Sequence, residues 1–117
     1  MSKRRTQPAD MTRLGIRVPT VLLYGVKRLA LDERTTMSLL VQRWIRTGLS
    51  DGFGNLFNIE VPTDGRMSEC RIQLPADTRQ ALRVRATELD LSGAHLMRLW
   101  MAQGLHDERN GSIPIAD

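Results

Sequence analysis

Two short stretches of the chain, residues 12–19 and 68–75, alternate polar with apolar residues and end at a proline. Alternation over this length predicts half-buried β-strands, in which successive side chains point to opposite faces. The polar side chains are of types that recognise nucleic acid: an arginine fork fits phosphate or guanine, glutamine fits adenine, and glutamate accepts from the cytosine amino group. The polar-face positions are Arg13, Gly15 and Arg17 in the first stretch, and Glu69, Arg71 and Gln73 in the second.

A strand this short is not stable alone, so we expect the two stretches to pair into one ribbon. One face of the ribbon is then apolar and faces a core, and it carries Leu14, Ile16, Val18, Cys70, Ile72 and Leu74. Cys70 is the single cysteine, which excludes an internal disulfide, and its position predicts a small buried hydrophobe. On the other face, Gly15 would let another backbone approach closely. The alternative for the polar face is that it is merely solvated.

Charge is distributed unevenly along the chain. Residues 1–46 hold ten Lys/Arg and three acidic residues, a net charge of +7, whereas residues 47–117 hold seven and ten, a net charge of −3. A basic first half favours an anionic partner approached from that side. The first eleven residues, with Lys3, Arg4 and Arg5, are expected to form a basic flexible arm. That arm either lies along DNA phosphates or serves only as a solubilising tail.

Several classes of protein are disfavoured. No apolar run has the length of a membrane span, and the first residues lack the apolar core of a signal peptide, so a cytoplasmic protein is expected. His95 and His106 are not spaced as a metal-ligand pair, and no nucleophile, base and orienting group can be assembled. We therefore expect neither an enzyme nor a metal or other cofactor.

Each predicted strand is followed by two predicted amphipathic helices. The first helix is expected from about Thr20 to Glu33, and Thr35 or Thr36 then caps a second helix that Gly48 ends. After the second strand, the residues from Pro75 open a helix, Ser92 caps the next one, and Gly104 ends it. The stripes of the two capped helices are Met37, Leu40, Val41, Trp44 and Ile45, and Leu96, Met97, Trp100 and Met101. Both tryptophans are expected in the core.

The landmarks of the first half recur in the second half at one constant displacement and without a gap, which indicates an internal duplication. Matching pairs are Ile16 and Ile72, Pro19 and Pro75, Ala30 and Ala86, Leu40 and Leu96, Trp44 and Trp100, and Gly48 and Gly104. We call this displacement, from Ile16 to Ile72, the repeat offset. Each repeat is too small to bury a core alone, so residues 12–49 and 68–105 should form one domain about a pseudo-twofold axis. Residues 50–67 are then a linker, strand-like in the middle, and residues 106–117 a short polar tail.

The order of these elements resembles that of the ribbon-helix-helix family of Arc- and MetJ-type DNA-binding proteins. In each half, a strand ending in Leu/Val-Pro is followed by an amphipathic helix, a Ser/Thr cap and a second amphipathic helix. The chain resembles the tandem variant, which holds both copies in one polypeptide. The resemblance implies a mainly α fold of four helices and one two-stranded antiparallel sheet, whose ribbon enters the DNA major groove. It also implies base contacts from the six polar-face positions. Phosphate contacts are implied for the helix N-termini, at Thr35, Thr36, Met37, Ser92, Gly93 and Ala94.

The partner expected from this resemblance is double-stranded DNA, bound by a monomeric pseudo-dimer with possible side-by-side association on DNA. The main interpretation is a transcriptional repressor that occupies an operator. The alternative is an accessory DNA-binding protein of plasmid conjugation (the relaxosome) or partition. An antitoxin is a weaker candidate, because only twelve residues follow Leu105. An interpretation of another class is a protein–protein interaction module that uses the ribbon edge or the linker.

Overall fold

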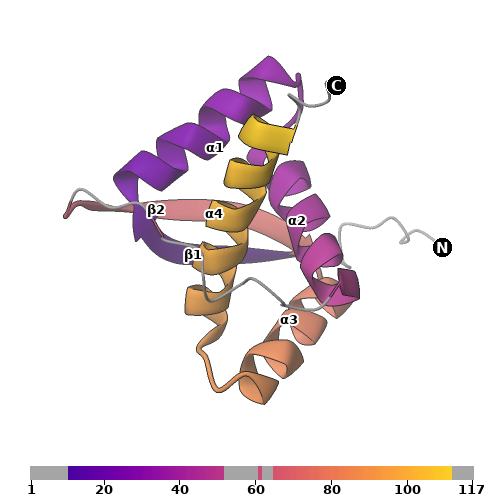
Figure 1. Cartoon of the computed structure of the whole chain (residues 1–117). Coiled ribbons are helices and arrows are strands. Elements are labelled where there is room, and N and C mark those ends of the chain that lie inside the picture. Colours follow the sequence, from indigo (N-terminus) through magenta and orange to yellow (C-terminus); the bar gives the residue numbers. More distant parts are fainter. Residues whose placement is uncertain (1–10, 52–60, 62–64, 112–117) are drawn as a thin grey trace, which may run out of the picture.

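The computed structural model describes residues 11–51, 61 and 65–111. The elements follow the order β1 (Met11–Pro19), α1 (Thr20–Asp32), α2 (Met37–Asp51), β2 (Met67–Pro75), α3 (Ala76–Glu88) and α4 (Gly93–Gly111) (Figure 1). The described residues thus form four helices and one two-stranded antiparallel sheet, as expected for the fold class. The basic arm with Lys3, Arg4 and Arg5, most of the linker and the last six residues lie outside the described residues.

The strands β1 and β2 pair in a single antiparallel register. Gly15 lies opposite Arg71, and the ladder extends four residues to either side, from Met11 opposite Pro75 to Pro19 opposite Met67. The separation of Gly15 and Arg71 along the chain equals the repeat offset, the displacement from Ile16 to Ile72. The ladder is therefore centred on a pair of equivalent positions.

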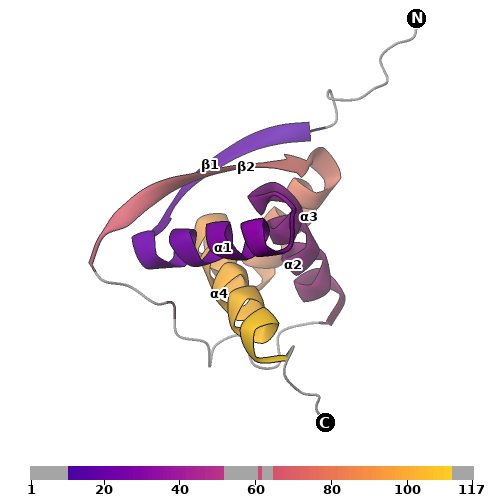
Figure 2. The same ribbon diagram turned by 90° about the horizontal axis from the view of Figure 1, so that it is seen from above.

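The apolar face of the ribbon covers the core. Figure 2 shows the ribbon along one side of the molecule and the helices on the other. Alternation decides which side chains are buried: Ile16, Val18, Cys70, Ile72 and Leu74 are each at most 8% exposed, whereas Leu14 is only partly buried. The helices contribute their stripes to the same core, including both tryptophans. The predicted core positions are therefore confirmed, except that Leu14 and Met37 are only partly buried.

The turns between helices repeat in the two halves. Thr36 Oγ1 accepts a hydrogen bond from the Leu39 N–H (3.1 Å), and Ser92 Oγ accepts one from the His95 N–H (3.0 Å), so both predicted caps are confirmed. Just before these caps, Arg34 and Asp90 adopt left-handed backbone conformations, with φ of 57° and 61°. They too are separated by the repeat offset, and each allows the chain to reverse between two helices.

The predicted helix ends at Gly48 and Gly104 are wrong. Helix α2 continues to Asp51 and α4 to Gly111, so residues 106–111 are helical rather than part of an irregular tail. A Cβ atom on Gly48 would overlap the indole of Trp100, and one on Gly104 would overlap the indole of Trp44. These glycines serve the close approach of a ring from the other half of the chain, and not the left-handed cap assumed from the sequence.

Candidate nucleic-acid interface

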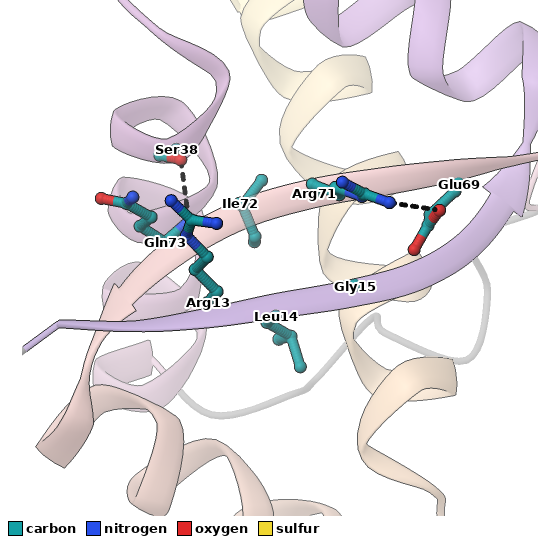
Figure 3. A pocket seen from close by; sticks show the side chains of 8 residues that line it. All are labelled: Arg13, Leu14, Gly15, Ser38, Glu69, Arg71, Ile72 and Gln73. Atoms are coloured by element: carbon teal, nitrogen blue, oxygen red, sulfur yellow. Dashed lines mark hydrogen bonds and ion pairs between the residues drawn. The ribbon is translucent and has the colours of Figure 1, made fainter.

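The six predicted polar-face residues lie together on the outer face of the ribbon. Alternation along two paired strands places every one of them on the side away from the core, and all six are exposed. All of them except Arg17 are labelled in the close view of this face (Figure 3), and Arg17 occupies the remaining outward position of β1. The predicted placement is therefore confirmed, while contact with DNA stays a prediction.

The two ends of this face carry different chemistry. At one end Arg13 lies opposite Gln73, and at the other Arg17 lies opposite Glu69. Within the described residues, the side chains of Arg13 and Arg17 make no ion pair, so both guanidinium groups are available to an external anion or base. The face as a whole is positive, because three arginines outnumber one glutamate.

At the centre of the face, Arg71 and Glu69 form an ion pair. Arg71 Nη2 lies 3.4 Å from Glu69 Oε1, and both side chains are largely exposed (Figure 3). Exposed pairs contribute little to stability because water screens them and both side chains lose freedom. The second carboxylate oxygen of Glu69 lies beside Gly15, where a side chain would crowd it.

A hollow of about 470 Å³ opens on the same face. Its walls include every polar-face residue except Arg17, and the apolar contribution comes from Leu14 and Ile72. Ser38, from the first turn of α2, completes the lining and was not predicted as a site residue. The hollow is thus lined by both the ribbon and the start of α2.

The helices hold the outer edges of both strands by hydrogen bonds that the sequence patterns did not predict. On β2, the Gln73 N–H donates to Ser38 Oγ (2.9 Å), and Gln42 Nε2 donates to the Gln73 carbonyl (3.0 Å). On β1, Arg98 Nη1 donates to the Arg17 carbonyl (2.7 Å). Gln42 and Arg98 are equivalent positions of the two halves, as are Gln73 and Arg17. The sequence held one signal of these contacts, because Gln42 is a polar residue beside the apolar stripe of α2. The structure leaves its side chain only 6% exposed.

The phosphate-contact residues predicted for the helix N-termini lie at or just before the starts of α2 and α4, whereas Lys3, Arg4 and Arg5 lie outside the described residues. The structure changes the role of Thr35, because its N–H donates to the Ala30 carbonyl (2.9 Å) and is not available to a phosphate. Thr36 and Ser92 use their hydroxyl groups as caps. The backbone N–H groups of Met37, Gly93 and Ala94 remain at helix starts, where the helix dipole favours an anion.

Beneath the ribbon, the Cys70 thiol is 1% exposed. Burial raises the pKa of this thiol above its ordinary value, and the positive charge of Lys27 opposes the shift only in part. Cys70 therefore stays protonated at neutral pH and acts as a small apolar residue, as predicted.

No protein-family model, curated protein or solved structure matched the chain in the comparisons. Across the described residues, no three or more His, Cys, Asp or Glu side chains gather in a way that could hold a metal ion. In the same part of the chain, no helix combines the length and apolar character that crossing a membrane requires. The function proposed below therefore rests on the geometry and chemistry of the ribbon face.

Proposed function

We propose that this protein binds double-stranded DNA sequence-specifically as a tandem ribbon-helix-helix pseudo-dimer. The observation that carries the proposal is the register of the ribbon, in which Gly15 lies opposite Arg71, its equivalent in the second repeat. The bounds of β1 and β2, and those of α1 and α3, are likewise displaced by the repeat offset. One chain thereby supplies two related halves, as two subunits do in a symmetric dimer.

The two-stranded form and the chemistry of the ribbon support a role in the major groove. That groove admits a two-stranded ribbon and presents a different donor and acceptor pattern for each base pair. The outer face offers three guanidinium groups, one amide and one carboxylate, all exposed. The start of α2 lies beside this face, because Ser38 lines the hollow. We propose that the N–H groups at the starts of α2 and α4 contact phosphates and so fix the ribbon on the duplex.

A protein of this kind represses transcription when its site overlaps an operator, and this is the role we propose. Binding at a plasmid transfer origin or partition site would use the same contacts, and the position of the binding site separates these roles. Selection of bound sequences from a random DNA pool identifies that site. A site located beside a promoter supports the repressor role.

The test of DNA binding is the affinity for a random duplex as a function of salt. Binding through phosphates releases counterions, so the affinity should fall steeply between about 50 mM and 200 mM salt. A protein–protein interaction module would show no such binding. Undetectable affinity at low salt, or affinity that salt does not change, would overturn the proposed function.

A further inference from the structure

Glu69 provides the only negative charge among the six outward positions of the ribbon. It lies directly opposite Arg17, yet its carboxylate turns toward the centre of the face. There Oε1 pairs with Arg71 Nη2 at 3.4 Å, and a Cβ on Gly15 would come within 2.9 Å of Oε2. The missing side chain at Gly15 therefore leaves the space that the carboxylate occupies (Figure 3).

This arrangement contributes little to the fold. The side chain of Arg71 is 81% exposed and that of Glu69 is 54% exposed, so the pair is screened by water and is readily exchanged for other partners. A carboxylate on a face that approaches DNA is unfavourable, because it repels the phosphates and the acceptor atoms of base edges. The free-energy penalty applies to every duplex that offers Glu69 no hydrogen-bond donor.

We infer that Glu69 is a specificity-determining residue that selects a cytosine on one side of the binding site, an inference that rests on the proposed DNA-binding function. In the major groove, the cytosine amino group donates to a glutamate oxygen. A site with cytosine at this place offsets the penalty, whereas random sequence does not. Glu69 thus lowers the affinity for random DNA more than it lowers the affinity for the preferred site.

The same geometry makes recognition directional. The opposite end of the ribbon carries Arg13 and Gln73, and the described strand residues at that end include no acid. A pseudo-twofold ribbon with Glu69 at one end only should prefer a non-palindromic site, with the selected cytosine in one half. The half that contacts Gln73 should instead favour adenine, because glutamine binds its N6 and N7 atoms.

The experiment compares the full chain with Glu69→Ala, Glu69→Gln and the control Asp107→Ala. For each protein, bound sequences are selected from a random pool, and affinity is measured for the wild-type site and for random duplex. Asp107 is exposed and accepts hydrogen bonds from Gln103 within α4. It lies near the far end of that helix, roughly 20 Å along the axis from Gly93 at its start. The control therefore removes one acidic side chain far from the ribbon.

We expect Glu69→Ala to raise random-duplex affinity roughly threefold to tenfold and to abolish the cytosine preference. The ratio of specific to random affinity should fall about tenfold. Glu69→Gln should raise random affinity similarly and move the preference toward adenine, whereas Asp107→Ala should leave the selected site unchanged. An identical base preference in the two halves read by one chain, or an unchanged cytosine in both Glu69 variants, overturns the inference while DNA binding stands. Failure of the wild-type protein to bind any duplex overturns the proposed function as well.

Discussion

The indole of Trp44 packs directly against Gly104, and the indole of Trp100 packs against Gly48 in the same way. Trp44 and Gly48 belong to α2, whereas Trp100 and Gly104 belong to α4. Each helix therefore supplies one ring and receives one ring, four residues apart on the same face. The two halves of the chain are joined by this reciprocal contact as well as by the ribbon.

Replacing Gly104 by alanine should destabilise the protein. The added methyl group overlaps the Trp44 indole in the core, and such overpacking costs about 1–3 kcal/mol. The higher helix propensity of alanine offsets up to about 1 kcal/mol of this cost. Urea unfolding should show a net loss for Gly104→Ala, whereas Gly93→Ala, where a Cβ meets open space, should show none. Equal stability of both variants would contradict the close contact.

The cap of α2 should contribute measurably to stability. Thr36→Ala removes the hydroxyl that accepts from the Leu39 N–H and should lower the free energy of unfolding by about 1 kcal/mol. Thr36→Ser retains an acceptor at the same position and should stay close to the wild type. Thermal or urea unfolding of the three proteins distinguishes loss of the cap from loss of the threonine methyl group.

The buried Cys70 thiol should make stability depend on alkaline pH. Its ordinary pKa is 9.0, and burial raises the pKa in the folded state, so the unfolded chain loses this proton first. The stabilising contribution is present below pH 9.0 and is lost as pH rises toward the folded-state pKa. Urea unfolding between about pH 7 and pH 10 should show a steeper decline for the wild type than for Cys70→Ala. Parallel declines would mean that the thiol is not protected by burial.

Two arginines on the outer face of the ribbon should matter for recognition and not for folding. Arg17→Ala and Arg71→Ala should each weaken specific DNA binding by roughly 1–3 kcal/mol. The Arg17 carbonyl still accepts from Arg98 in the variant, because that contact uses only the backbone of residue 17. Arg46→Ala removes an exposed arginine from the later turns of α2 and serves as the charge-matched control. Loss of folding, or binding equal to that of Arg46→Ala, would contradict the assignment of the outer face.

Local patterns predicted much of this architecture. Alternation placed Arg13, Gly15 and Gln73 on the outer face, because successive side chains of a strand point to opposite faces of the sheet and the apolar ones face the core. The Thr36 and Ser92 caps were also predictable, since a hydroxyl reaches the N–H three residues ahead within one turn. The repeat offset predicted the partner strand and, with it, an antiparallel pairing of equivalent positions.

The sequence by itself therefore determined the elements, their order, the buried and exposed faces, and the pairing of the two strands. Only the tertiary structure decided that α2 and α4 run past Gly48 and Gly104, that Gln42 and Arg98 hold the strand edges, and that Glu69 turns toward Arg71 over Gly15. The physical reason is range. Side-chain periodicity and helix capping depend on residues a few positions apart in one segment. The three features above depend instead on contacts with distant segments or with the opposite strand, which a local sequence pattern does not predict.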